Sequence, residues 1–153
     1  MKNILIAGFA FVYLTLASTA SASSCESTCQ LDLVNSYFKA LDKIAKKGSS
    51  SADIDFLLNT THDDVNYIHV EYEANFTKDS WRKAFNRNLE LGAYQNDESN
   101  EIRVLNSIPG KNYMAIEYAH GVIQADGKWQ PTEPLLVIFG FTENKISLVK
   151  ELW

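Results

Sequence analysis

The spacing of apolar residues changes part-way along the chain, from the period of a helix to that of a strand. In residues 30–47 the apolar side chains recur at three- and four-residue steps, which places them on one face of a helix. From residue 101 onward, segments rich in β-branched and aromatic residues are separated by turn signals such as Pro109-Gly110 and Asp126-Gly127. Helices first and strands after predict an α+β fold, in which the helices pack on one face of a curved antiparallel or mixed sheet.

Three helices are predicted before the run of strands. The first covers residues 29–47, and the second begins at a cap on Ser51 or Asp53. The third helix follows Thr77, which is predicted to be its N-cap. A turn at 60–64 separates the second helix from the first strand. Strands are predicted at 65–72, 101–108, 112–125, 134–142 and 145–153.

The N-terminus has the features of a secretory signal peptide. A basic start is followed by an uncharged apolar run at 4–17 and by small residues with an Ala-x-Ala pattern, which predicts cleavage after Ala22. The apolar run is shorter than the roughly 20 residues of a membrane-spanning helix, so a retained anchor is the minor alternative. Residues 1–22 are thus expected to be a signal peptide, and the mature chain to be secreted or periplasmic.

Charge and size restrict the partners of the mature chain. Removing 22 of the 153 residues leaves 131, a single-domain length that can bury a core. The net charge of the whole chain is −5, and its basic residues are scattered without forming a stripe. Nucleic acid is therefore an unexpected partner. No further apolar segment has membrane length, so no membrane association is expected after the signal peptide is removed.

The two cysteines, Cys25 and Cys29, lie in a short N-terminal segment, 23–29, that follows the predicted cleavage site. Exported proteins meet oxidising conditions, so a local Cys25–Cys29 disulfide is predicted. Such a bridge would restrain the start of the first helix and little else. A redox or metal-binding role lacks further ligands nearby in the sequence.

Three segments carry a resemblance to a known superfamily: SYFKALDK in the first helix, DFLLNTTHDDVNYIHV from helix into strand, and the closing hairpin LLVIFGFTENKISLVKELW. Together they resemble the nuclear-transport-factor-2-like (NTF2-like) superfamily, which includes ketosteroid isomerases and SnoaL-type polyketide cyclases. The resemblance covers nearly all of residues 30–153. It implies a SnoaL-like domain in which about three helices pack on the concave face of a cone-shaped sheet.

The resemblance also implies positions for catalytic groups. The isomerases of this superfamily use a tyrosine on the first helix, an aspartate base at the end of the first strand and a protonated aspartate on a later strand. Here Tyr37 matches the tyrosine and His69 takes the place of the base, while Val137 or a neighbour stands where the acid is needed. Two of the three positions differ, so steroid isomerisation itself is not expected.

The residues themselves suggest a related site. His69 shares a strand face with Val65 and Tyr67, which suits the wall of a cavity, and histidine titrates near neutral pH. His120 shares a face with Met114, Ile116 and Tyr118, so it is expected to enter the same pocket. The predicted catalytic residues are Tyr37, His69 and His120. The plain alternatives are a core tyrosine and two hydrogen-bonded histidines with structural roles.

Aromatic side chains are spread over elements that should converge on one interior, where some would line an apolar pocket and others would form the core. The predicted ligand-binding residues are Phe38, Tyr67, Trp81, Phe85, Tyr118 and Phe139. In the last strand, Val149 and Trp153 are expected on the outer face, which suggests a homodimer formed through the sheet face.

No metal or cofactor is expected from the sequence. His62, His69 and His120 lack the short spacing of a ligand set, and His62 is expected in a turn with two aspartates. No glycine-rich phosphate loop and no nucleophile elbow occurs.

Two hypotheses of function follow. The first is a pocket for a small apolar or aromatic molecule, with cofactor-independent acid–base activity of the isomerase, cyclase or dehydratase kind left open. The alternative is a non-catalytic module for dimerisation or partner binding.

Overall fold

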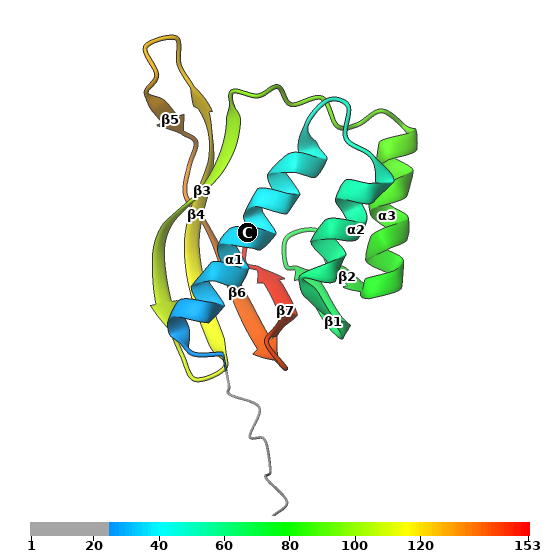
Figure 1. Cartoon of the computed structure of the whole chain (residues 1–153), viewed down its shortest axis with the longest axis vertical. Helices are drawn as coiled ribbons and strands as arrows, with labels where there is room; N and C mark the ends of the chain where they lie inside the picture. Colours follow the sequence, from blue (N-terminus) through cyan, green and yellow to red (C-terminus); the bar gives the residue numbers. More distant parts are fainter. Residues whose placement is uncertain (1–24) are drawn as a thin grey trace, which may run out of the picture.

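The computed structural model describes residues 25–153, so the predicted signal peptide, 1–22, and residues 23–24 lie outside the described residues. Helices α1, α2 and α3 lie on one side of a seven-stranded sheet (Figure 1). The helices are α1 Ser27–Ala45, α2 Ser51–Asn59 and α3 Lys78–Glu90. The strands are β1 Thr61–His69, β2 Ala74–Thr77, β3 Asn100–Pro109, β4 Tyr113–Ile123, β5 Trp129–Pro131, β6 Leu135–Thr142 and β7 Lys145–Glu151.

Local side-chain chemistry sets the starts of α2 and α3. The N-cap of α2 is Ser50, one residue before the predicted Ser51, so that prediction is wrong by one position. Asp53 contributes from the first turn, because its Oδ2 accepts hydrogen bonds from the Ser50 backbone N–H at 2.8 Å and from Ser50 Oγ at 2.9 Å. Thr77 is the N-cap of α3, as predicted, and its Oγ1 accepts a hydrogen bond from the Ser80 N–H at 3.4 Å.

The sheet is mixed and curled without closing on itself. Its strand order is β2-β1-β7-β6-β4-β3, and β5 pairs with β4 at the end of a projecting arm (Figure 1). The β1–β7 pair is parallel and the other pairs are antiparallel. This pairing brings the strand that follows α2 beside the last strand of the chain. The α+β cone with three helices on its concave face is therefore confirmed.

Strand β1 begins earlier than the sequence predicts. Residues 60–64 were expected to form a turn, but β1 starts at Thr61, and so His62 and the two aspartates after it belong to the strand. The reason is the parallel partner: Thr61 pairs with Ile146 of β7, and an irregularity in register follows before Asn66 pairs with Leu148. The short strands β2 and β5 were also absent from the sequence-based prediction.

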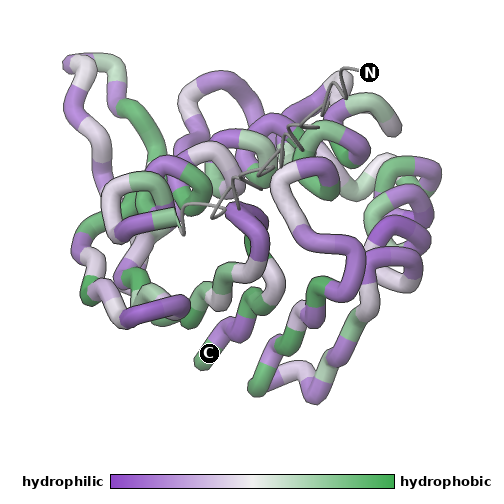
Figure 2. The backbone as a smooth tube through the Cα atoms, turned by 60° about the horizontal axis from the view of Figure 1, so that its bottom comes forward, coloured by the Kyte–Doolittle hydropathy of each residue, from purple (hydrophilic) through white to green (hydrophobic). Residues whose placement is uncertain are grey.

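The concave face of the sheet and the apolar faces of the helices form the core. Along the strands, apolar and polar residues alternate, which Figure 2 shows as alternating green and purple segments. In β4, for example, Met114, Ile116 and Tyr118 are buried, whereas Tyr113 and Glu117 point outward and are exposed. Among the described residues, no helix combines the length and the apolar character needed to cross a bilayer.

Cys25 and Cys29 are joined by a disulfide at the start of α1, with Cα atoms 5.4 Å apart. The buried side chain of Gln30 attaches this turn to the rest of the fold. Its Nε2 donates hydrogen bonds to the Cys25 carbonyl at 3.0 Å and to the Lys111 carbonyl, between β3 and β4, at 3.3 Å. The bridge therefore holds a local turn against the β3–β4 hairpin.

Removing the disulfide should have a small and local effect. The double variant Cys25→Ser/Cys29→Ser is expected to lose about 2 kcal/mol of unfolding free energy or less, because the closed loop is very short. Urea unfolding measures the loss, and hydrogen exchange should place the faster exchange in the first turns of α1. A loss above about 4 kcal/mol, or faster exchange across the sheet, would contradict this assignment.

Candidate functional site

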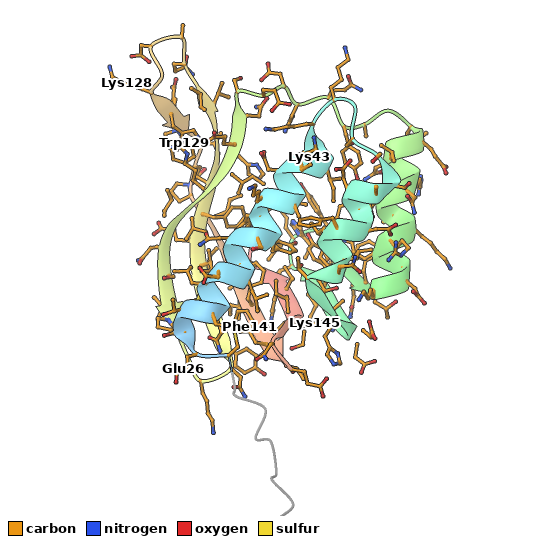
Figure 3. All side chains as sticks on the ribbon, viewed as in Figure 1. Glu26, Lys43, Lys128, Trp129, Phe141 and Lys145 are labelled. Carbon is orange, nitrogen blue, oxygen red and sulfur yellow. A yellow bond between two sulfur atoms is a disulfide. The ribbon has the colours of Figure 1, made fainter. Side chains whose placement is uncertain are left out.

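An aromatic cluster fills the space between the helices and the sheet (Figure 3). All six residues predicted to bind ligand belong to it, together with Tyr37. Phe38 of α1 lies with its ring centroid 4.7 Å from that of Tyr118 and 5.7 Å from that of Phe139, and Trp81 of α3 stacks on Tyr67 at 4.6 Å. The members of the aromatic cluster are Tyr37, Phe38, Tyr67, Trp81, Phe85, Tyr118 and Phe139. These residues converge as predicted, but they do so as packed core.

Tyr37 lies at the centre of the aromatic cluster and is fully buried. Its ring lies 5.2 Å from Phe139 and 6.2 Å from Trp81. Among the described residues, its hydroxyl has no hydrogen-bond partner, which is unusual for a buried tyrosine. Burial raises the pKa of this hydroxyl well above its ordinary value, so it is a proton donor and not a base.

A buried carboxyl group, Glu151 at the end of β7, borders the aromatic cluster. Glu151 is 3% exposed, and its Oε2 accepts hydrogen bonds from Tyr118 Oη at 3.0 Å and from Trp153 Nε1 at 3.0 Å. The same indole N–H also lies 3.1 Å from Tyr118 Oη. We call these three side chains, Tyr118, Glu151 and Trp153, the carboxyl triad.

Glu151 stands in the middle of the sheet, between β6 and β1. It pairs with Val137 on one side and with His69 on the other. Val137 is the position at which the superfamily resemblance required an acid that the sequence lacks. The neighbouring strand β7 therefore supplies a carboxyl group directly beside Val137, the position at which the superfamily resemblance requires an acid.

The environment of Glu151 favours its protonated form. Burial raises the pKa of this carboxyl group, and the hydrogen bonds from Tyr118 and Trp153 offset the increase in part. The charge of Glu151 in turn adds to the effect of burial in raising the pKa values of Tyr37, Tyr67 and Tyr118. Four ionisable side chains are thus coupled around one point of the concave face.

His69 lies at the outer edge of the same region. It is 4% exposed, its ring stacks on Tyr72 with ring centroids 4.2 Å apart, and the centroid of the roughly perpendicular Trp153 ring lies 4.3 Å away. His69 Nδ1 accepts a hydrogen bond from the Tyr72 N–H at 3.4 Å, so the proton of the neutral ring is on Nε2. Nε2 is buried without a partner among residues 25–153, and burial lowers the pKa of the ring.

No protein-family model matches the sequence, and the comparison with curated proteins found no match either. Solved structures do match. A protein from Catenulispora acidiphila with a ketosteroid isomerase-like fold, solved with trimethylamine, superposes with a TM-score of 0.55 at 14% identity, over 80% of this chain and 85% of that one. The chain has the NTF2-like fold.

Two further structures with this architecture carry names that suggest enzymes. A putative polyketide cyclase from Sinorhizobium meliloti has a TM-score of 0.52 at 16% identity, covering 78% of this chain and 93% of its own. An M. tuberculosis LEH-like epoxide hydrolase has a TM-score of 0.54 at 14% identity, covering 81% of each chain. Identities this low establish the shared fold, and the chemistry has to be argued from the residues of this chain.

Within the NTF2-like cone, the three predicted catalytic residues do not meet. Tyr37 lies inside the aromatic cluster, whereas His69 lies outside it, in contact with Tyr72 and Trp153. His120 lies beside Tyr118, with ring centroids 5.9 Å apart, but it is exposed, so the prediction that it enters a buried pocket is wrong. The pairing of β4 with β6 ends at Tyr118–Leu135, and beyond it β4 continues into the projecting arm with β5, away from the core.

The placement of Val149 and Trp153 on the outer face is also wrong. Val149 is fully buried, and Trp153 joins the carboxyl triad on the concave side. The cause is a β-bulge: Phe141 pairs with Ile146 but Gly140 pairs with Leu148, so Ser147 is an extra residue in β7. After the bulge, each residue of β7 points to the face opposite to the one expected from strict alternation that starts at Ile146.

Glu151 and Trp153 are the two candidate site residues that the sequence-based prediction missed. One signal was present: a single acidic residue alternates with two apolar ones, Val149 and Trp153, at the end of a strand.

Residues 25–153 contain no group of three or more His, Cys, Asp or Glu side chains arranged to hold a metal ion. The side chains present at this site, Glu151, the tyrosines and His69, can transfer protons and form hydrogen bonds.

Proposed function

We propose that the chain is an exported NTF2-like domain that binds a small apolar or aromatic molecule next to Glu151. One observation carries this proposal: a buried carboxyl group is held at the concave face by Tyr118 and Trp153, and its raised pKa is offset by these two hydrogen bonds alone. Burying an acid in this way is costly, so such groups are concentrated at functional sites.

The chemistry that fits this site is cofactor-independent acid–base catalysis. Burial raises the pKa of the Glu151 carboxyl group, which makes its carboxylate a stronger base than a carboxylate in water. Tyr37 and His69 Nε2 supply buried donors without partners among the described residues, and either could polarise a carbonyl oxygen. Isomerisation, cyclisation and dehydration beside a carbonyl group are the reactions of this kind. The trimethylamine complex of the structural neighbour is consistent with a small ligand.

Native mass spectrometry of the gently purified chain tests this function. The wild-type protein is expected to retain a small molecule that leaves on denaturation, and Glu151→Gln is expected to retain at least tenfold less, since the carboxyl group is the proposed anchor. Glu117→Gln is the matched control, because Glu117 is exposed on the outer face of β4. Equal occupancy in the Glu151→Gln protein would refute the role of the carboxyl group.

A second candidate function has its own observation. The outer face of the sheet exposes large apolar side chains, and neighbouring strands bring several of them together around a depression of about 280 Å³. This depression is lined by Asn106, Ile108, Ala115, Glu117, Pro134, Leu135 and Leu136. Ile108 is 66% exposed and Leu136 is 44% exposed. An exposed apolar sheet face of this kind supports a homodimer formed through the sheet.

The dimer proposal predicts a change in mass in solution. Ile108→Arg places a charge in the exposed apolar face, and it should weaken self-association at least tenfold if this face is the interface. Light scattering across a concentration series would measure the effect, with Phe56→Arg on α2 as the control. A wild-type chain that stays monomeric at high concentration would remove this candidate.

A further inference from the structure

Trp153 occupies a position that a ligand of the carboxyl triad would need. Its indole N–H points at two oxygens, Glu151 Oε2 at 3.0 Å and Tyr118 Oη at 3.1 Å. An indole N–H can only donate, so Trp153 supplies the hydrogen that this pair of oxygens accepts. Any molecule that replaces the indole must supply the same hydrogen, or a buried carboxyl group loses a partner.

The indole lies against two aromatic rings, and we call the volume that the indole itself fills the slot. The edge-on contact with His69 has an interplanar angle of 79°, and the ring of Tyr72 lies 6.2 Å away at 78°. His69 and Tyr72 stack on each other and so form a rigid wall. Tyr72 is 68% exposed, which means that this wall reaches from solvent to the buried carboxyl group. The slot is therefore bordered by aromatic rings and has two hydrogen-bond acceptors at its inner end, and the Trp153 side chain that fills it is half-buried.

Trp153 lies outside the strands of the sheet. Strand β7 ends at Glu151, and the backbone of Trp153 takes part in one hydrogen bond, in which its carbonyl accepts from the Glu71 N–H at 3.2 Å. Glu71 lies in the turn between β1 and β2, where Glu73 has a positive φ of 51°. The deeper members of the triad are fixed differently, because Tyr118 and Glu151 both belong to central strands. Trp153 is half-buried, whereas Tyr118 and Glu151 are buried, so the indole is the member of the triad nearest to solvent.

We propose that the position of the Trp153 indole is the ligand subsite of this pocket, and that it takes a flat aromatic molecule with one N–H or O–H donor on its edge. Indoles and phenols are the two chemical classes that fit. The ligand displaces Trp153, packs edge-on against the rings of His69 and Tyr72, and donates to Glu151 and Tyr118. This inference rests on the function proposed above, because it names the ligand class of the same site.

The same geometry excludes other classes of ligand from this subsite. A ligand with a carboxylate would place a second acid beside Glu151, and no cation among residues 25–153 contributes to the environment of that group. An aromatic hydrocarbon or an ether of the same shape would fill the slot, but it would leave Tyr118 Oη without a donor and Glu151 Oε2 with one hydrogen bond in place of two. The subsite should thus prefer indole over benzofuran, which has the same outline and no N–H.

The test uses the purified wild-type chain and two probes, indole and benzofuran. The chain has three tryptophans, so the indole N–H signal of Trp153 can be assigned in an NMR spectrum by comparison with Trp153→Phe. Indole is expected to shift or broaden the Trp153 signal and to leave the Trp129 signal unchanged, because Trp129 lies on the distant β5 arm (Figure 3). Benzofuran is expected to bind at least tenfold more weakly.

Two variants make the test independent of any single substitution. Trp153→Ala empties the slot, and Trp153→Phe keeps a ring but removes the N–H. Both should bind indole at least about tenfold more tightly than the wild type does, because the internal competitor is gone or weakened. Trp129→Ala is the matched control and should bind indole as the wild type does. If Trp153→Ala does not fold, Trp153→Phe alone decides the comparison.

Several results would overturn the inference. Indole binding that leaves the Trp153 signal unmoved would place the ligand elsewhere, and equal affinity for benzofuran would remove the requirement for a donor. Failure of indole to bind any of the proteins would exclude the ligand class. A wild-type chain that retains a small molecule dependent on Glu151 while Trp153 stays in place would overturn this inference and leave the proposed function standing.

Discussion

Replacing Phe139 by alanine should destabilise the protein by about 3–5 kcal/mol, the largest effect on stability that we expect from a single substitution. Phe139 is fully buried on β6, and its ring lies 5.2 Å from Tyr37 and 5.7 Å from Phe38. Removing the ring deletes contacts on several sides at once, and the surrounding strands and helix can collapse only partly into the space. Urea unfolding of the wild type and the variant measures the difference.

Phe56→Ala is the matched control, since Phe56 is 62% exposed on α2 and should change stability by less than about 1 kcal/mol. The comparison also bears on function. If Phe139→Ala cost no more than Phe56→Ala, the aromatic cluster would be loosely packed and the cone would have room for a ligand among its rings. A large cost instead restricts ligand binding to the edge of the cluster, near Glu151.

Glu151→Gln should change how the stability of the protein depends on pH. Burial raises the pKa of Glu151 in the folded chain above its value in the unfolded chain. Between these two pKa values the folded chain binds more protons, so its unfolding free energy falls as the pH rises through that window. The loss is complete above the folded pKa and amounts to about 1.4 kcal/mol for each unit that separates the two values.

The glutamine variant lacks this titration, so its stability relative to the wild type should increase with pH across the same window. His69, whose pKa is lowered by burial, titrates in both proteins and cancels in the difference. Unfolding in urea at a series of pH values would measure the two profiles, with Glu117→Gln as the control. Parallel profiles for the wild type and Glu151→Gln would mean that Glu151 titrates as it does in the unfolded chain.

A buried acid that weakens the fold at neutral pH is hard to explain by stability alone. Val137 lies beside Glu151 in the sheet and is fully buried, so an apolar residue is evidently accommodated at this depth. Replacing buried polar groups by apolar ones of similar volume is often neutral or stabilising. The presence of Glu151, with Tyr37 and His69 left as unpaired buried donors among the described residues, therefore favours a ligand-dependent role.

Much of the architecture could be predicted from local patterns. The three helices, the N-cap Thr77 and most of the strands follow from the period of apolar residues and from turn chemistry, which are properties of neighbouring residues in the chain. The convergence of the predicted aromatic residues was also foreseeable, since each lies on the apolar face of its own element. Burial of these rings as a continuous core follows from the same patterns.

The candidate site depended on contacts that no local pattern contains. One extra residue, Ser147, reverses the faces of the rest of β7, and this reversal brings Val149, Glu151 and Trp153 to the concave side. His120 shares the alternation of Tyr118 but lies where β4 leaves the core for the arm with β5. A single-residue change in register or the end of a neighbouring strand decides such positions.

The sequence by itself thus determined the fold class, the number of helices and which side chains are apolar enough to form the interior. Only the tertiary structure decided which polar group is buried among them. The parallel pairing of β1 with β7 sets Glu151 beside His69, and the antiparallel pairing with β6 sets it beside Val137. The physical reason is that strand pairing joins residues far apart in the chain, whereas periodicity records only the face on which a residue lies in an ideal strand.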